Sequence, residues 1–191
     1  MKLQIKWIAV AVALVTGNVM AKPTASIKTG FTSVAADAGF LAAAKSLKVT
    51  VAPITGKKLQ FGIVAGNIDL ANAKGEIVHN GGLVLKSATT TVELRNFIID
   101  TTGTAPVLTG LVVANEGTVG RIPLFDLVLP TGIMLPLKAQ GPMKSLTLAD
   151  VSMKLTSGAA TTLNGAFGVT AFTAGLPIGT AKVKGFGLMN K

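Results

Sequence analysis

Few side chains in this sequence could carry chemistry, and His79 is the first of them. It is the only histidine, and there is no cysteine. Zinc sites are built mainly from those two residue types, so the usual ligand set cannot be assembled. A Ser-His-Asp triad would need His79, but the sequence contains no Gly-x-Ser-x-Gly elbow. Two roles for His79 therefore stay open: a turn residue fixed by a backbone carbonyl, or a ligand contact.

The residues after His79 favour a close approach of another group. Asn80, Gly81 and Gly82 follow it directly. Glycine has no Cβ, so a neighbouring backbone or a flat ligand can come near. If this segment binds a ligand, we expect His79, Gly81 and Gly82 to form the contact.

The eight acidic residues could in principle supply a pair of carboxylates for glycoside hydrolysis. Asp126 is the unusual one, because it lies within the apolar run 122–129. Buried acids are normally hydrogen-bonded or paired, and Arg95 is the expected partner. Arg121 is at an odd spacing on the same predicted strand, which places the two side chains on opposite faces. We predict no catalytic residue and no enzyme, with a hydrolase using Asp126 as the minor alternative.

The first 21 residues read as a cleavable signal peptide. Lys2 and Lys6 precede an apolar stretch over residues 7–15, and Ala21 is a suitable residue before the cleavage point. No later stretch is long and apolar enough to span a membrane. We expect an exported protein, periplasmic or secreted, whose residues 22–191 form a single domain.

The charge pattern does not indicate nucleic-acid binding. The formal net charge is +10, but the lysines are dispersed along the chain. Proteins that bind nucleic acids usually show a basic stripe with interleaved aromatic residues. We therefore expect a solvated basic surface and no nucleic-acid partner.

The hydrophobic spacing predicts a mainly β protein, an antiparallel sheet or sandwich with one or two short helices. Residues 22–30 are expected to be a flexible lead-in, and a helix capped by Ser33 is expected over 33–47. A second short helix, capped by Ser157 and running through Leu163 to Phe167, is also expected. Alternating apolar residues predict the strands. Their expected ranges are 49–53, 59–65, 76–79, 83–85, 91–95 with a bulge at Asn96-Phe97, 107–114, 119–129, 146–155 and 178–186.

The stretch 130–142 is expected to be a loop, because it holds three prolines and two glycines. Its apolar residues Ile133, Met134 and Leu135 could be tucked into the protein or could form an exposed lip.

Five stretches follow one family's pattern in order and spacing. They are His79-Asn80-Gly81-Gly82-Leu83, residues 91–100, residues 120–126, residues 155–164 and residues 178–181. The series resembles the Htaa domains of bacterial haemin-uptake proteins. The resemblance implies an exported β-rich domain that can hold haem as cofactor or cargo. It also implies a tyrosine ligand to the iron, supported by the histidine of the motif.

Only the histidine of that implied site is carried over, onto His79. The sequence has no tyrosine, and the region expected to hold one offers Phe31 and Phe40. One alternative is that His79 binds the iron itself. A methionine would then stand opposite, and the candidates are Met134, Met143, Met153 and Met189.

The leading hypothesis is an exported, non-catalytic binding module of Htaa type for haem or another flat apolar ligand. The second is a structural or surface-interaction domain that has kept the fold and lost the haem site, with the loop 130–142 as a docking surface for a partner.

Overall fold

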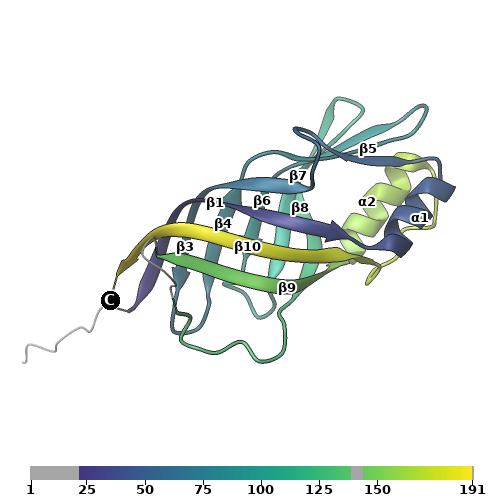
Figure 1. Ribbon diagram of the computed structural model, residues 1–191. Coiled ribbons are helices and arrows are strands. Elements are labelled where there is room, and N and C mark those ends of the chain that lie inside the picture. The colour runs from purple at the N-terminus through teal and green to yellow at the C-terminus, as the bar shows by residue number, and fades with distance from the viewer. Residues whose placement is uncertain (1–21, 139–143, 191) are drawn as a thin grey trace, which may run out of the picture.

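The computed structural model describes residues 22–138 and 144–190, and it is built mainly of antiparallel strands (Figure 1). The mainly β fold expected from the alternating sequence is confirmed. The elements in chain order are β1 (Thr24–Ala36), α1 (Ala38–Ser46), β2 (Thr50–Pro53), β3 (Gln60–Asp69), β4 (Gly75–His79), β5 (Gly82–Lys86), β6 (Thr91–Asp100), β7 (Val107–Ala114), β8 (Gly117–Val128), β9 (Ser145–Leu155), α2 (Ser157–Phe167) and β10 (Pro177–Asn190).

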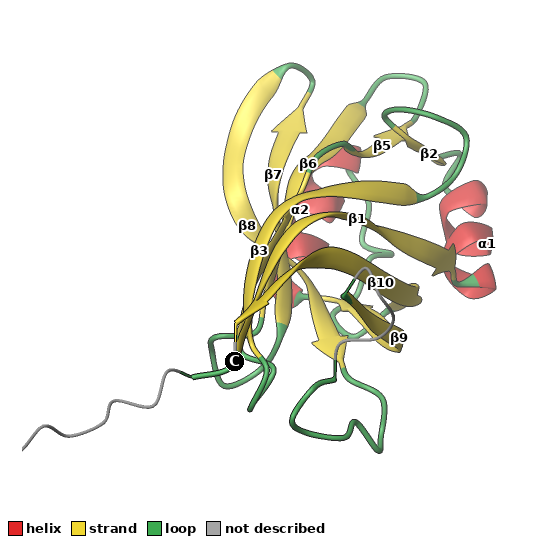
Figure 2. Ribbon diagram, turned by 60° about the vertical axis from the view of Figure 1, so that its left-hand side comes forward, coloured by secondary structure: helices red, strands yellow, loops and turns green. Residues whose placement is uncertain are grey.

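The sheet closes on itself into a barrel. Its strand order is β2-β5-β6-β4-β3-β1-β10-β9-β8-β7, and β7 also pairs with β6. The strands from β4 through β3, β1, β10, β9, β8 and β7 to β6 thus form a ring, and β5 and β2 branch from it. Figure 2 shows β1, β3 and β10 bending around one side of this ring. Closure pairs the edges that an open sheet would expose.

A bulge in β6 produces the branch. Arg95 is the last residue paired with β5, and the pairing with β4 begins at Ile98. Asn96 between them has φ 51°, and its N–H donates to the Gly81 carbonyl at 2.9 Å. The bulge expected at Asn96-Phe97 is therefore confirmed. It lets one strand hold β4 along one half and β5 along the other.

The expectation of a flexible lead-in at the N-terminus was wrong, and the first helix begins later than expected. Strand β1 runs through both the expected flexible lead-in and the first residues of the expected helix. Helix α1 starts at Ala38, and its cap is Asp37, which accepts a hydrogen bond from the Phe40 N–H at 3.0 Å. Ser33 instead pairs with Lys182 of β10 and Gln60 of β3. Pairing on both sides outweighs the weak helical preference of this alanine-rich stretch.

The second helix lies where the sequence predicts it, but its cap is one residue earlier than the expected Ser157. Helix α2 is capped by Thr156, whose hydroxyl accepts a hydrogen bond from the Ala159 N–H at 3.1 Å. Gly168, with φ 65°, ends it in the left-handed conformation. Both helices lie at the same end of the barrel (Figure 1). Neither of the helices found in the described residues has the length and hydrophobicity needed to cross a membrane.

The described part of the expected loop between β8 and β9 is indeed irregular. Met134 is 79% exposed and Leu135 is 51% exposed, so these two side chains project outward, whereas Ile133 is half-buried. Residues 139–143 lie outside the described residues.

Candidate functional site

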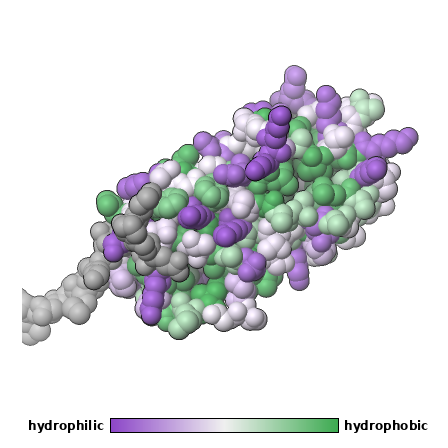
Figure 3. Space-filling model, viewed as in Figure 1, coloured by the Kyte–Doolittle hydropathy of each residue, from purple (hydrophilic) through white to green (hydrophobic). Residues whose placement is uncertain are grey.

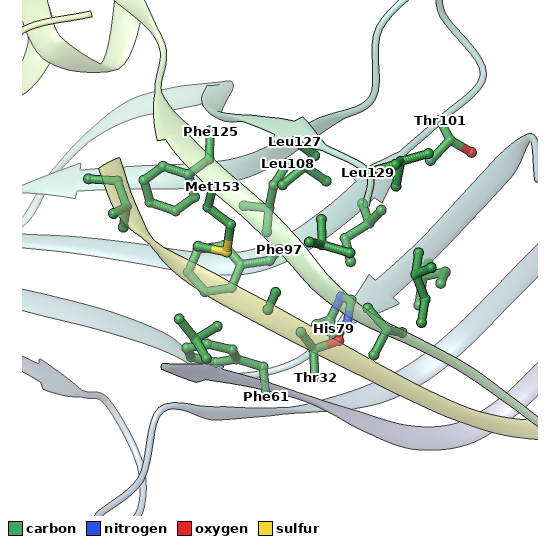
Figure 4. A pocket seen from close by; sticks show the side chains of 18 of the residues that line it. Thr32, Phe61, His79, Phe97, Thr101, Leu108, Phe125, Leu127, Leu129 and Met153 are labelled. Carbon is green, nitrogen blue, oxygen red and sulfur yellow. Dashed lines mark hydrogen bonds between the residues drawn. The ribbon is translucent and has the colours of Figure 1, made fainter. Parts of the chain in front are cut away.

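The interior of the barrel contains an apolar cavity of about 90 Å³. Its wall includes residues from nearly every strand of the ring, because every second side chain of a strand points inward. Most lining residues are aliphatic or aromatic, and the polar ones are three threonines and His79. Figure 4 shows Phe61, Phe97, Phe125 and Met153 on its walls, with Thr101 well separated from His79.

His79 reaches this cavity from the last position of β4. Its side chain is 2% exposed, and its Nε2 lies 2.8 Å from the hydroxyl of Thr32 on β1. Strand β3 runs between the two, with Ile63 paired to His79 and Phe61 paired to Thr32. Figure 4 shows the hydroxyl of Thr32 directed at one ring nitrogen of His79.

The second ring nitrogen of His79 is buried and lacks a partner. Nδ1 makes no hydrogen bond of normal geometry to any described residue. Such orphan atoms are rare in protein interiors, because burying a polar group without a partner costs about 1–3 kcal/mol.

Burial keeps His79 neutral. It lowers the pKa of the imidazole from 6.5 to about 4, because the charged form is poorly solvated inside the barrel. Hydrogen-bonding interactions of the ring with the backbone of Phe97 and Ile77 oppose this shift more weakly, although neither contact has normal hydrogen-bond geometry at Nδ1. At neutral pH the ring is therefore an uncharged group with one nitrogen bound to Thr32 and the other without a partner of normal hydrogen-bond geometry.

The remaining buried threonine of the cavity already has its partners. The Thr101 hydroxyl donates to the Ala73 carbonyl at 2.7 Å and accepts from the Gly75 N–H at 2.9 Å. It ties the β3–β4 turn to the end of β6, so its role is structural. The buried groups in the cavity that could still hydrogen-bond a ligand are therefore His79 and Thr32.

The two glycines of the motif do not line the cavity with His79. Gly81 has φ 82°, a conformation that L side chains rarely adopt. A Cβ on Gly82 would lie 2.1 Å from the Leu94 carbonyl oxygen, so β5 approaches β6 too closely for any side chain there. The backbone geometry at the branch between β4 and β5 therefore explains why both positions are glycine.

Asp126 does not form the expected pair. Its side chain is exposed, and Arg95 contacts Glu93 instead. The prediction that the odd spacing places Arg121 and Asp126 on opposite faces was also wrong, because both side chains are exposed. A register shift in the pairing of β8 with β7 falls between them and reverses the alternation. Within the described residues, no group of three or more His, Asp or Glu could hold a metal ion.

Thr32 is the site residue that the sequence did not reveal. Nothing in its sequence context distinguishes it from other threonines, and only the closure of the barrel brings it beside His79.

Of the two phenylalanines singled out earlier, Phe40 is buried and lines the cavity. Among the methionines, Met153 lines the cavity and Met134 is exposed, whereas Met143 and the side chain of Met189 lie outside the described residues.

Solved structures with the same architecture identify the fold. The C-terminal domain of HtaA from Corynebacterium glutamicum superposes with a TM-score of 0.62 over 87% of this chain and 99% of that domain, at 17% identity. The chain has an HtaA-like fold. A second HtaA structure, the domain-swapped dimer of a histidine-to-alanine variant of the same domain, covers 78% of this chain with a TM-score of 0.53.

The HtaA-like fold is supported by structure rather than by close sequence similarity. The sequence matches no family model, and the search of curated proteins gave no significant match. The resemblance inferred from the five stretches is thus confirmed at the level of the fold. Because the identity is only 17%, the similarity shows the fold alone. The function of this barrel depends on the residues of its own cavity.

Proposed function

We propose that this protein is a non-catalytic binding module whose barrel takes a small, flat, apolar ligand with one hydrogen-bonding group. The observation that carries the proposal is the orphan Nδ1 of His79 on the wall of an otherwise apolar cavity. Binding pockets typically combine apolar walls with a few placed polar groups that fix the ligand's orientation. His79 and Thr32 are such a group.

A hydroxyl on the ligand suits either tautomer of His79. If Nε2 accepts the Thr32 proton, Nδ1 carries a hydrogen and needs an acceptor. If Nε2 donates to Thr32, Nδ1 needs a donor. A hydroxyl group can act as either, so a phenol or alcohol satisfies the ring in both cases.

The size of the cavity favours a single ring. An engineered dry cavity of about 150 Å³ binds benzene, whereas pockets for drug-sized ligands hold roughly 300–1,000 Å³. A cavity of about 90 Å³ is closer to the first class. A ring the size of phenol would enter with small adjustments of the surrounding side chains.

The residues do not fit haem as the resemblance implies it. The sequence supplies no tyrosine, and the Nε2 of His79 is bound to Thr32. The only other candidate ligand described in the cavity is Met153, and the enclosed space is far below that of a pocket for a large cofactor. We therefore favour a smaller ligand over haem.

The proposal also includes the place where the protein acts, outside the cytoplasm. The basic and apolar segments before Ala21 are typical of a signal peptide, so the barrel would act in the periplasm or outside the cell.

The test is a comparison of phenol with toluene, which has nearly the same shape but no hydroxyl. Both should raise the melting temperature, because ligands that bind the folded state stabilise it. Phenol should bind about fivefold more tightly than toluene, because one additional hydrogen bond contributes about 1 kcal/mol to the binding free energy. His79→Leu should remove this preference while keeping toluene binding.

A matched control and a haem titration make the result decisive. Ser46→Ala changes a hydroxyl that bonds the Ala43 carbonyl on the surface of α1, and it should leave both affinities unchanged. Hemin should give no saturable Soret shift. If neither small ligand raises the melting temperature, the cavity is a packing defect and the proposal fails. If hemin binds and His79→Leu abolishes it, the ligand class is haem.

A further inference from the structure

The loop between β8 and β9 carries two adjacent exposed apolar side chains. Met134 and Leu135 are 79% and 51% exposed, and Pro136 beside them is exposed as well. We call Met134, Leu135 and Pro136 the lip. Figure 3 shows hydrophobic atoms at the lower edge of the molecule, where this loop lies in Figure 1. Adjacent exposed apolar side chains on a projecting loop are a candidate contact surface.

The lip is held against the barrel on its C-terminal side. The Leu137 N–H donates to the Leu70 carbonyl at 2.7 Å, and the Leu70 N–H donates to the Pro23 carbonyl at 2.8 Å. Leu137 also lines the barrel cavity, as does Leu129 before the lip. The apolar residues on either side are thus used by the fold, and only the lip projects outward.

Exposed lysines lie on the segments that flank the lip or are hydrogen-bonded to its C-terminal side. Lys138 follows it directly, Lys144 precedes β9, and Lys22 adjoins the Pro23 that bonds Leu70. Two acids at this end of the barrel accept hydrogen bonds in turns and keep their negative charge, so the lysines outnumber them only narrowly. Asp69 accepts from the Ala71 N–H, and Asp100 accepts from the Thr102 N–H and hydroxyl.

We infer that the lip docks on an anionic lipid surface. Apolar side chains on a projecting tip can enter the headgroup region, and nearby lysines are attracted to negatively charged lipids. A stable protein interface needs roughly 800 Å² from each partner, far more than three side chains on a loop provide. The combination of a small apolar tip and flanking positive charge therefore favours a membrane surface over a protein partner.

The test is co-sedimentation of the mature chain with vesicles of phosphatidylcholine alone or mixed with phosphatidylglycerol. We expect binding to the mixed vesicles that weakens as salt is raised. Met134→Ser with Leu135→Ser should reduce the affinity at least about tenfold, because the inserted apolar area is lost. Lys138→Gln with Lys144→Gln should reduce it by up to about fivefold per lysine at low salt.

The matched control is Val64→Thr with Val119→Thr. These valines are 49% and 53% exposed, and they lie on strands β3 and β8 and not in the loop. It should bind vesicles like the wild type, and thermal unfolding of every variant checks that the barrel is intact. Failure of the wild type to bind mixed vesicles, or unchanged binding by the lip variant, would overturn the inference. A dimer in sedimentation velocity that the lip variant dissolves would assign the lip to self-association instead. None of these measurements depends on a ligand in the cavity.

Discussion

At the scale of single residues, His79 is the group that the barrel treats most unusually. It is buried, neutral and half satisfied, with one nitrogen on Thr32 and the other without a partner. A structural histidine normally has both nitrogens satisfied. An orphan atom in an apolar cavity lowers the stability of the free protein and would be satisfied by a bound ligand.

The buried imidazole predicts a pH-dependent stability. Its pKa is about 4 in the folded state and 6.5 when solvated, so below pH 6.5 the unfolded chain binds a proton that the folded chain refuses. The free energy of unfolding should therefore fall by roughly 3 kcal/mol as the pH is lowered from 6.5 to 4. Urea unfolding across this range should show the fall in the wild type and not in His79→Gln.

Thr32→Val is the control for that experiment. It removes the hydroxyl next to His79 but keeps a titrating imidazole, so its pH dependence should resemble the wild type. The carboxyl of Asp100, whose pKa is lowered mainly by hydrogen bonds from Thr102, titrates equally in all three proteins and cancels in the comparison. An equal pH dependence in His79→Gln would show that His79 is solvated.

At the scale of elements, the branch of the sheet at β6 sets the position of His79. β4 ends at His79, the chain turns through Gly81, and β5 begins on the other half of β6. The turn is possible because Gly81 adopts φ 82° and Gly82 passes close to the Leu94 carbonyl. Backbone geometry is sufficient to account for both glycines.

Gly82→Ala should destabilise the protein by about 1–3 kcal/mol, the usual cost of forcing an extra carbon into a packed site. The new Cβ would lie 2.1 Å from the Leu94 oxygen and 3.0 Å from the Arg95 Cα, both backbone atoms that cannot move alone. Gly165→Ala in α2 is the matched control, because nothing lies within 4 Å of its Cβ position. That change should stabilise the helix by roughly 0.5–1 kcal/mol. Urea unfolding of both variants measures the difference, and equal effects would contradict the close approach at Gly82.

At the scale of the whole molecule, the fold relies on its core and on the closure of the sheet. The chain has no cysteine, so no disulfide supports it. The interior side chains form a single hydrophobic cluster that joins the barrel and both helices. The formal net charge is +10, and hydrophilic side chains are scattered over the face shown in Figure 3.

Export predicts a defined mature chain. If the protein is expressed in full in a cell that processes it, the exported form should begin at Lys22, because Ala21 is the expected cleavage residue. Intact-mass measurement of the protein from the periplasm or medium reads the N-terminus directly. A mass that includes residues 1–21 would show a retained anchor, and Ala21→Asp should slow processing because a charged residue is poorly tolerated there.

The sequence by itself determined the strand-rich fold, most strand positions, the bulge in β6 and the turn after His79. These features depend on local alternation and on residues with special φ angles, which act over a few positions. It also determined the absence of thiol chemistry, since no cysteine is present. Only the tertiary structure decided that residues 24–36 are a strand, because their pairing partners lie far away on β3 and β10. It likewise decided that Thr32 meets His79, that Arg95 contacts Glu93 instead of Asp126, and that the cavity is small and almost wholly apolar. Contacts between residues distant in the chain depend on barrel closure and strand register, and no local pattern specifies them.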